Sequence, residues 1–180
     1  MNLHPIAVHF PIALLTLYSV MEMFRYRRVV EQPWWFHMKA FLVILGTLAA
    51  NGASLTGEMI AEQLKASGVL PSIVATHEQW AKITIGIYSL LAAAYLVVWM
   101  ERTGVLNRLF PDPIGGFRDL FDRRLFPAAR YFIKSYFSAV IALLGLIAIT
   151  ITGALGGSMV YGPDVDPVAR IVYDLLIPTP

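Results

Sequence analysis

Residues 136–161 read YFSAVIALLGLIAITITGALGGSMVY and contain no charged side chain. A helix rises about 1.5 Å per residue, so a run of this length crosses the roughly 30 Å hydrocarbon core of a bilayer. The whole chain has the same character, because 57% of its 180 residues are hydrophobic and only 14% are charged. Soluble domains carry about 25% charged residues. The stretch therefore predicts a membrane-spanning helix, and the composition predicts a membrane protein.

Three further apolar runs precede this one, and they predict spans at about residues 5–24, 38–60 and 77–100. The expected fold is all-α, an integral membrane four-helix bundle that forms a single transmembrane domain over residues 1–180. Between the last two spans, the segment FRDLFDRRLF at residues 117–126 predicts a short helix lying on the inner membrane surface. Its alternative role is a docking surface for a partner.

Most of the basic residues lie on one side of the predicted spans. Eleven of the 14 lysines and arginines fall in or beside the first and third loops, namely Arg25, Arg27, Arg28, Lys39, Arg102, Arg108, Arg118, Arg123, Arg124, Arg130 and Lys134. The positive-inside rule places both loops in the cytoplasm and both termini outside. No basic residue precedes the first apolar run, so an uncleaved span is expected rather than a signal peptide. The predicted location is the bacterial inner membrane, with multiple passes.

The chain has no cysteine, and this limits its chemistry. Disulfides, thiolate metal sites, iron–sulfur clusters and covalently attached c-type haem are excluded. The sequence has no nucleophile–base arrangement, phosphate-binding loop or nucleic-acid motif. Independent catalysis and a nucleic-acid partner are therefore not expected.

Histidines lie at the predicted outer ends of two spans. His4 and His9 occur in HPIAVHFPIALL at the start of the first span, and His77 precedes the third. In an up-down four-helix bundle these two spans are diagonal, so a side chain from each reaches a shared central cofactor. His9 and His77 are predicted to hold haem iron. His4 is about 140° around the helix from His9 and is expected to be an interfacial partner, a proton-path group or an alternative ligand.

Further polar residues are expected near these histidines. Thr76 and Gln79 have the spacing of a capping box, which predicts that the third span begins at His77. Glu58, Glu78 and Lys82 are predicted to orient the histidines, with a Glu58–Lys82 ion pair as the alternative. The fourth histidine, His37, lies in a predicted aromatic belt with Trp34, Trp35 and Phe36 and has no predicted ligand role.

The segments HPIAVHFPIALL, TGEMIAEQ, HEQWAKIT and GALGGSMVYG resemble the DUF2231 family of small bacterial four-helix membrane proteins. The resemblance extends from about residue 3 to 162, and its motif positions are His4, Pro5, His9, Phe10, Pro11, Gly57, Glu58, His77 and Glu78. Some relatives look joined to cytochrome c-type modules, which implies electron transfer. The sequence departs from the family after Tyr161, where Gly162, Pro163 and Asp164 replace a basic or histidine-containing stretch. The tail carries instead a short apolar stripe of Val168, Ile171, Val172, Leu175 and Leu176.

Together these patterns predict a membrane b-type cytochrome-like electron-transfer subunit that holds haem b near the outer face. Its expected partners are the lipid bilayer, other subunits of a membrane redox complex, and an outer cytochrome c-type acceptor or donor. One alternative is a copper or zinc site formed by His4, His9 and His77 with Glu58 or Glu78. The other is a structural or assembly subunit whose histidines bind nothing.

Overall fold

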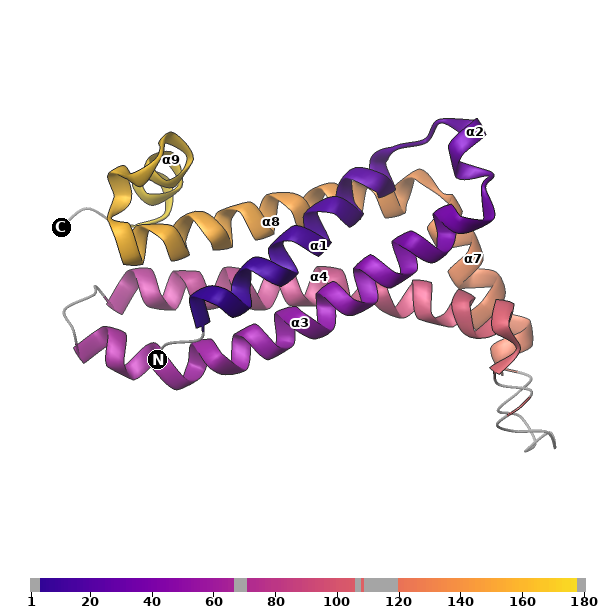
Figure 1. Cartoon of the computed structure of the whole chain (residues 1–180), viewed down its shortest axis with the longest axis horizontal. Helices are drawn as coiled ribbons and strands as arrows, with labels where there is room; N and C mark the ends of the chain where they lie inside the picture. The colour runs from indigo at the N-terminus through magenta and orange to yellow at the C-terminus, as the bar shows by residue number, and fades with distance from the viewer. Residues whose placement is uncertain (1–3, 67–70, 106–107, 109–119, 178–180) are drawn as a thin grey trace.

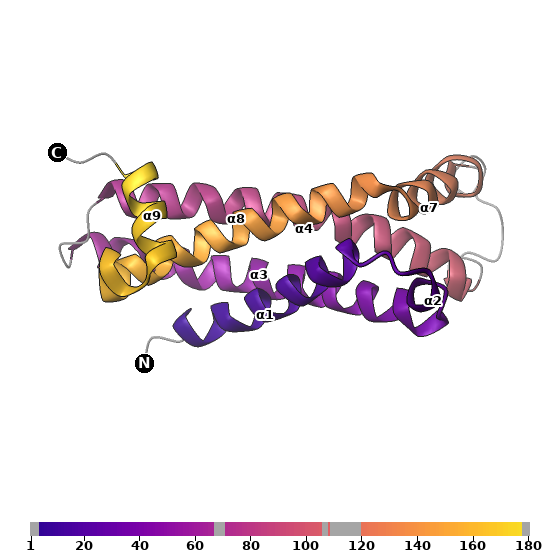
Figure 2. The same cartoon turned by 90° about the horizontal axis from the view of Figure 1, so that it is seen from above.

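A computed structural model describes residues 4–66, 71–105, 108 and 120–177 of the chain, and every regular element in these ranges is helical. Four long helices run side by side (Figures 1 and 2). They are α1 (His4–Met23), α3 (Pro33–Ala66), α4 (Pro71–Thr103) and α8 (Tyr136–Tyr161). The shorter elements are α2 (Arg27–Val30), the π-helical turn η1 (Phe121–Leu125), α7 (Phe126–Lys134), the 3₁₀ turn η2 (Pro163–Val165) and α9 (Pro167–Leu176).

The long helices form a closed ring of neighbours. Helix α1 packs on α3 and α8, and α4 packs on the same two helices, so α1 and α4 lie diagonally across the bundle as predicted. Helices α3, α4 and α8 are each long and apolar enough to cross a membrane. The bounds of α8 coincide with the predicted span 136–161.

Two helices extend beyond their predicted spans. Helix α3 begins at Pro33 and α4 at Pro71, because the fixed φ of proline suits the first turn of a helix. The predicted cap at Thr76 is therefore wrong: the Thr76 hydroxyl lies inside α4 and donates to the Ser72 carbonyl at 2.8 Å. His77 consequently lies about 9 Å along the helix instead of at its first residue.

The predicted aromatic belt at the start of α3 is only partly at the surface. Trp34 is exposed, but Trp35 and Phe36 are buried. The Phe36 ring stacks on Tyr95 of α4 with 5.6 Å between centroids. Half of the belt therefore belongs to the core.

Small residues bring the helix backbones together at two positions. A Cβ at Gly46 would lie 2.7 Å from Leu15 of α1, and a Cβ at Gly145 would lie 2.9 Å from Tyr88 of α4. Side chains from neighbouring helices thus occupy the space that a larger residue would need, as expected for helices that associate within a bilayer.

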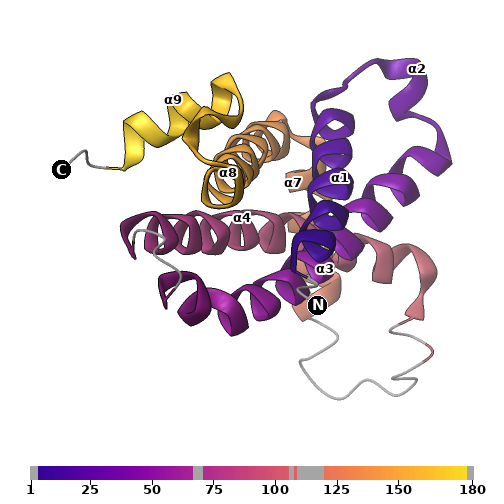
Figure 3. The ribbon, with the colours of Figure 1, turned by 60° about the vertical axis from the view of Figure 1, so that its left-hand side comes forward.

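Helix α9 crosses the end of α8 (Figure 3), and its predicted apolar stripe is partly buried and partly exposed. Ala169 and Val172 are buried, whereas Val168, Ile171 and Leu175 are exposed. The helix begins at Asp166, whose Oδ1 accepts hydrogen bonds from the backbone N–H groups of Val168 and Ala169. On its exposed side, hydrogen bonds to Asp174 and Asp164 raise the pKa of the Arg170 guanidinium, so this residue stays charged at any physiological pH.

The predicted inner-surface helix at 117–126 is only partly within the described residues, since 117–119 lie outside them. The chain there forms the π-helical turn η1 and then continues as α7 to Lys134, eight residues beyond the predicted end. Phe126 and Ile133 are buried and hold α7 to the bundle. Arg130 and Tyr131 face outward.

Candidate functional site

His77 is held by a hydrogen bond between α4 and α8. Its Nδ1 lies 3.0 Å from the backbone carbonyl oxygen of Thr152. A carbonyl oxygen only accepts hydrogen bonds, so Nδ1 is the donor and a neutral imidazole then carries its lone pair on Nε2. Gly156 adds close contact, because a Cβ there would lie 3.3 Å from the ring carbon Cε1. The ring orientation is thereby restricted.

The structure does not bury His9, although His9 was the predicted buried ligand. His9 is exposed, whereas Pro11, Leu15 and Tyr18 of the same helix are buried. The backbone of His4 belongs to α1, and its side chain is outside the described part of the structure. Within the described part, no three histidine or acidic side chains gather closely enough to hold a metal ion.

The three polar residues predicted near the histidines lie at the surface. Glu58, Glu78 and Lys82 are all exposed. Lys82 pairs with Glu78 one turn earlier on α4, with 2.6 Å between Nζ and Oε1, so its observed partner is not Glu58. His37 is exposed near the start of α3, where its ring contacts Phe36.

A second polar site lies toward the other end of the bundle and centres on Glu22. This side chain is fully buried. Its Oε1 accepts hydrogen bonds from Ser138 at 2.6 Å and Arg25 at 3.1 Å. Its Oε2 accepts from Lys39 at 2.9 Å and Tyr95 at 2.5 Å. We call these five residues the Glu22 cluster, and they include members from all four long helices.

The Glu22 cluster satisfies a buried carboxylate completely. Burying an unpaired ion costs several kcal/mol, and charge-assisted hydrogen bonds offset that cost only when the geometry is good. The carboxylate has two cations beside it, and the partly exposed Arg25 also donates to the Ser135 carbonyl at 2.9 Å. The cluster thus ties α1 to α3, α4 and α8 at one level of the bundle.

Sequence reasoning missed this cluster and treated two of its members differently. The sequence places Arg25 and Lys39 among the basic residues in or beside the first loop, but in the structure Lys39 is buried inside α3 and Arg25 pairs with Glu22. The sequence feature that could have revealed the cluster is Glu22, because an acidic residue within an apolar helix is costly and requires a partner.

Aromatic rings continue the contact between α1 and α4 beyond the cluster. Tyr18 meets the ring edges of Tyr95 and Tyr88 at centroid distances of 5.7 Å and 6.3 Å. Ser19 and Tyr88 share a hydrogen bond of 2.7 Å. These fully buried side chains fill the centre of the bundle, so the two diagonal helices meet through side chains.

A bundle of long apolar helices around a buried ion cluster defines an all-helical membrane protein, surrounded by the lipid bilayer. The chain belongs to the DUF2231 family, whose model is described as a predicted membrane protein and matches residues 1–168. This membership confirms the resemblance found in the sequence motifs. No curated protein and no solved structure matches the chain.

Proposed function

We propose that the chain crosses the inner membrane four times, with the Glu22 cluster near the cytoplasmic face and His77 near the outer face. Helix α1 has 20 residues, enough for about 30 Å of hydrocarbon. Glu22 is the acidic residue on the core-facing side of α1. Lys39 and Arg25 neutralise its charge, which offsets the cost of burying it within a span. Exposed arginines lie at the Glu22 end, and the positive-inside rule favours the cytoplasm for them.

We propose further that the protein is a b-type cytochrome-like electron-transfer subunit in which His77 would help to hold haem b, a group that would supply one-electron transfer. The observation that carries this proposal is the Nδ1–H bond from His77 to the Thr152 carbonyl. Ligand histidines typically donate their second ring nitrogen to a carbonyl or carboxylate, which orients the ring and makes it a better ligand. Haem bound there would exchange single electrons with the partner subunits.

Helix α1, diagonal to α4, supplies the second ligand in this proposal. The buried residues Pro11, Leu15, Tyr18 and Glu22 mark the core side of α1 at spacings of four and three. Counting back seven residues from Pro11 reaches position 4, whereas position 9 falls outside this series. The register therefore favours His4 over His9. His77 and His4 would together be the two side chains that hold haem.

A histidine scan tests the proposal, because the chain has only four histidines. Full-length protein from haem-replete cells is purified in detergent, and the haem bound per chain is measured. We expect wild-type protein to bind haem, and His77→Ala and His4→Ala to lose it. His9→Ala is expected to keep the haem, as is the matched control His37→Ala at the other end of the bundle. Wild-type protein without haem, or His77→Ala with full haem, would refute the proposal.

A further inference from the structure

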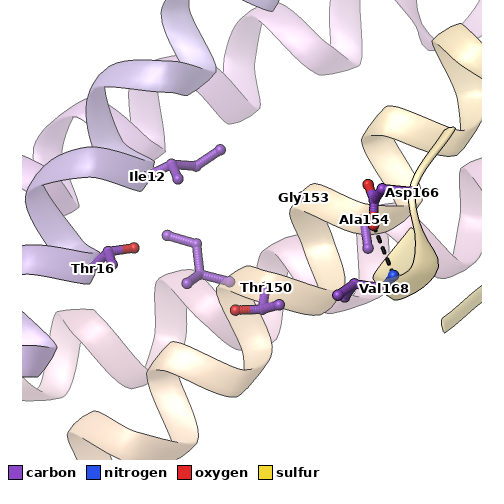
Figure 4. A pocket seen from close by; sticks show the side chains of 8 residues that line it. Ile12, Thr16, Thr150, Gly153, Ala154, Asp166 and Val168 are labelled. Carbon is purple, nitrogen blue, oxygen red and sulfur yellow. Dashed lines mark hydrogen bonds between the residues drawn. The ribbon is translucent and has the colours of Figure 1, made fainter. Parts of the chain in front are cut away.

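A pocket of about 340 Å³ lies between α1, α8 and the start of α9 (Figure 4). Its volume is at the lower end of the roughly 300–1,000 Å³ range of small-molecule sites. The residues that matter for its chemistry are Ile12, Thr16, Ile149, Thr150, Gly153 and Asp166. A Cβ on Gly153 would meet no atom within 4 Å, so the glycine keeps this wall of the pocket open.

The pocket faces the surroundings of the bundle rather than its core. Ile12 and Val168 line it and are both exposed. In the proposed arrangement both α1 and α8 cross the membrane, so a ligand would enter the pocket from the lipid. Ile147 and Leu143 continue the same exposed side of α8 from Thr150, at spacings of three and four residues. This strip suits the apolar tail of a ligand whose polar ring occupies the pocket.

Three polar side chains line the pocket, Thr16, Thr150 and Asp166, and the last two offer hydrogen-bond acceptors to a ligand. The Thr150 hydroxyl donates its hydrogen to the Leu146 carbonyl at 2.8 Å, so it offers only lone pairs to a ligand. Asp166 uses Oδ1 for both bonds that cap α9, and its Oδ2 has no hydrogen bond to a described residue. An acceptor-rich site favours a ligand that donates, and its carboxylate disfavours an anionic phosphate head group.

We propose that this pocket binds the ring of a lipid-soluble quinol. A quinol is neutral and donates through its hydroxyl groups, whereas the oxidised quinone only accepts hydrogen bonds. The site should therefore prefer the reduced form. This inference rests on the proposed function, because it names the class of membrane electron donor, but binding is measured separately from haem content.

The test compares three probes on the purified full-length protein under anaerobic conditions. They are a decyl benzoquinol, its oxidised quinone and dodecyl phosphate, titrated by calorimetry in detergent. We expect the quinol to bind at least tenfold more tightly than either other probe. Equal affinities for quinol and quinone, or tighter binding of dodecyl phosphate, would overturn the proposal.

Two variants locate the binding. Gly153→Leu fills the open space in the pocket and is expected to weaken quinol binding at least tenfold. The matched control is Gly86→Leu on α4, which is equally open and should stay within twofold of wild type. Asp166→Asn keeps a good helix cap but adds an N–H donor, so it should reduce the preference for quinol over quinone at least threefold. Unchanged quinol binding in Gly153→Leu would contradict the proposed location, and unchanged selectivity in Asp166→Asn would contradict the proposed cause.

Discussion

The two ends of the bundle are built by different means. At the Glu22 end, a buried carboxylate binds side chains from every other long helix, and rings of tyrosine and phenylalanine fill the space around it. At the His77 end, an imidazole–carbonyl bond and a hydrogen bond between two threonine hydroxyls join α4 to α8, and a buried apolar cluster that includes Ile73, Leu155 and Val172 packs α4, α8 and α9 together. The first end is therefore held by a buried charge and its hydrogen bonds, whereas the second is held mainly by apolar packing and has a pocket between α1, α8 and α9.

The largest expected effect is at Glu22. Glu22→Gln keeps the shape of the side chain but leaves Lys39 and Arg25 without their counter-charge. We expect the free energy of unfolding to fall by about 3–5 kcal/mol, measured by denaturant unfolding in detergent micelles. The double variant Glu22→Gln with Lys39→Met should lose less than the sum of the two single losses, by about 0.5–3 kcal/mol. Strict additivity would show that the ion pair does not hold the helices together.

How far the sequence predicts this arrangement differs between elements. The bounds of α8 agree with the predicted span at about residues 136–161, because this stretch has no charge between its ends. The start of α4 was misplaced because Thr76 and Gln79 imitate a cap, whereas Pro71 marks the real first turn. The spacing of residues along the chain shows which side chains share a face of one helix. It does not show which side chains of different helices meet, so the ion pair between Glu22 and Lys39 could not be predicted.

The same limit applies to the candidate site. The sequence predicted the diagonal relation of α4 to α1 from span order, and the helix contacts confirm it. The ligand role of His77 stays a prediction. The sequence did not reveal that His9 is exposed, because the proline-containing start of α1 gave no clear core face. In the structure, the burial of Pro11, Leu15 and Tyr18 shows which side of α1 faces the core.

Close packing gives the next largest expected effect. In Gly145→Ala, the new methyl group would press against the fully buried Tyr88 ring, and we expect a loss of about 1–3 kcal/mol in the free energy of unfolding. In Gly153→Ala, nothing lies within 4 Å, so higher helix propensity should stabilise the fold by about 0.5–1 kcal/mol. Thermal unfolding of the two variants side by side provides the check. Equal shifts in Tm would show that the contact with Tyr88 does not distinguish Gly145 from Gly153.

Removing one hydroxyl from the Glu22 cluster should cost less than removing its charge. Tyr95→Phe keeps the ring contacts and deletes one of four donors to Glu22, so we expect a loss of about 1–3 kcal/mol. Tyr161→Phe, at an exposed position in α8, should change the free energy of unfolding by less than about 0.5 kcal/mol. If denaturant titrations give the same free energy of unfolding for the two variants, the Tyr95 hydroxyl does not help to hold the helices together.

The smallest effect is expected for an ion pair at the surface. Arg27 and Glu31 pair at 2.7 Å but are largely exposed. Glu31→Gln should therefore cost about 0–1 kcal/mol, and the effect should shrink as salt is added. A loss as large as that of Glu22→Gln would mean that burial is not what distinguishes the cluster.

The most direct test of the division between the two ends is an absorption spectrum, recorded in the oxidised and dithionite-reduced states. Wild-type protein, His77→Ala and Tyr95→Phe are purified from the same haem-replete host. We expect a Soret band and split visible bands on reduction in wild type and in Tyr95→Phe, and their loss in His77→Ala. A wild-type protein without a Soret band, or a His77→Ala variant that keeps it, would show that His77 does not hold haem.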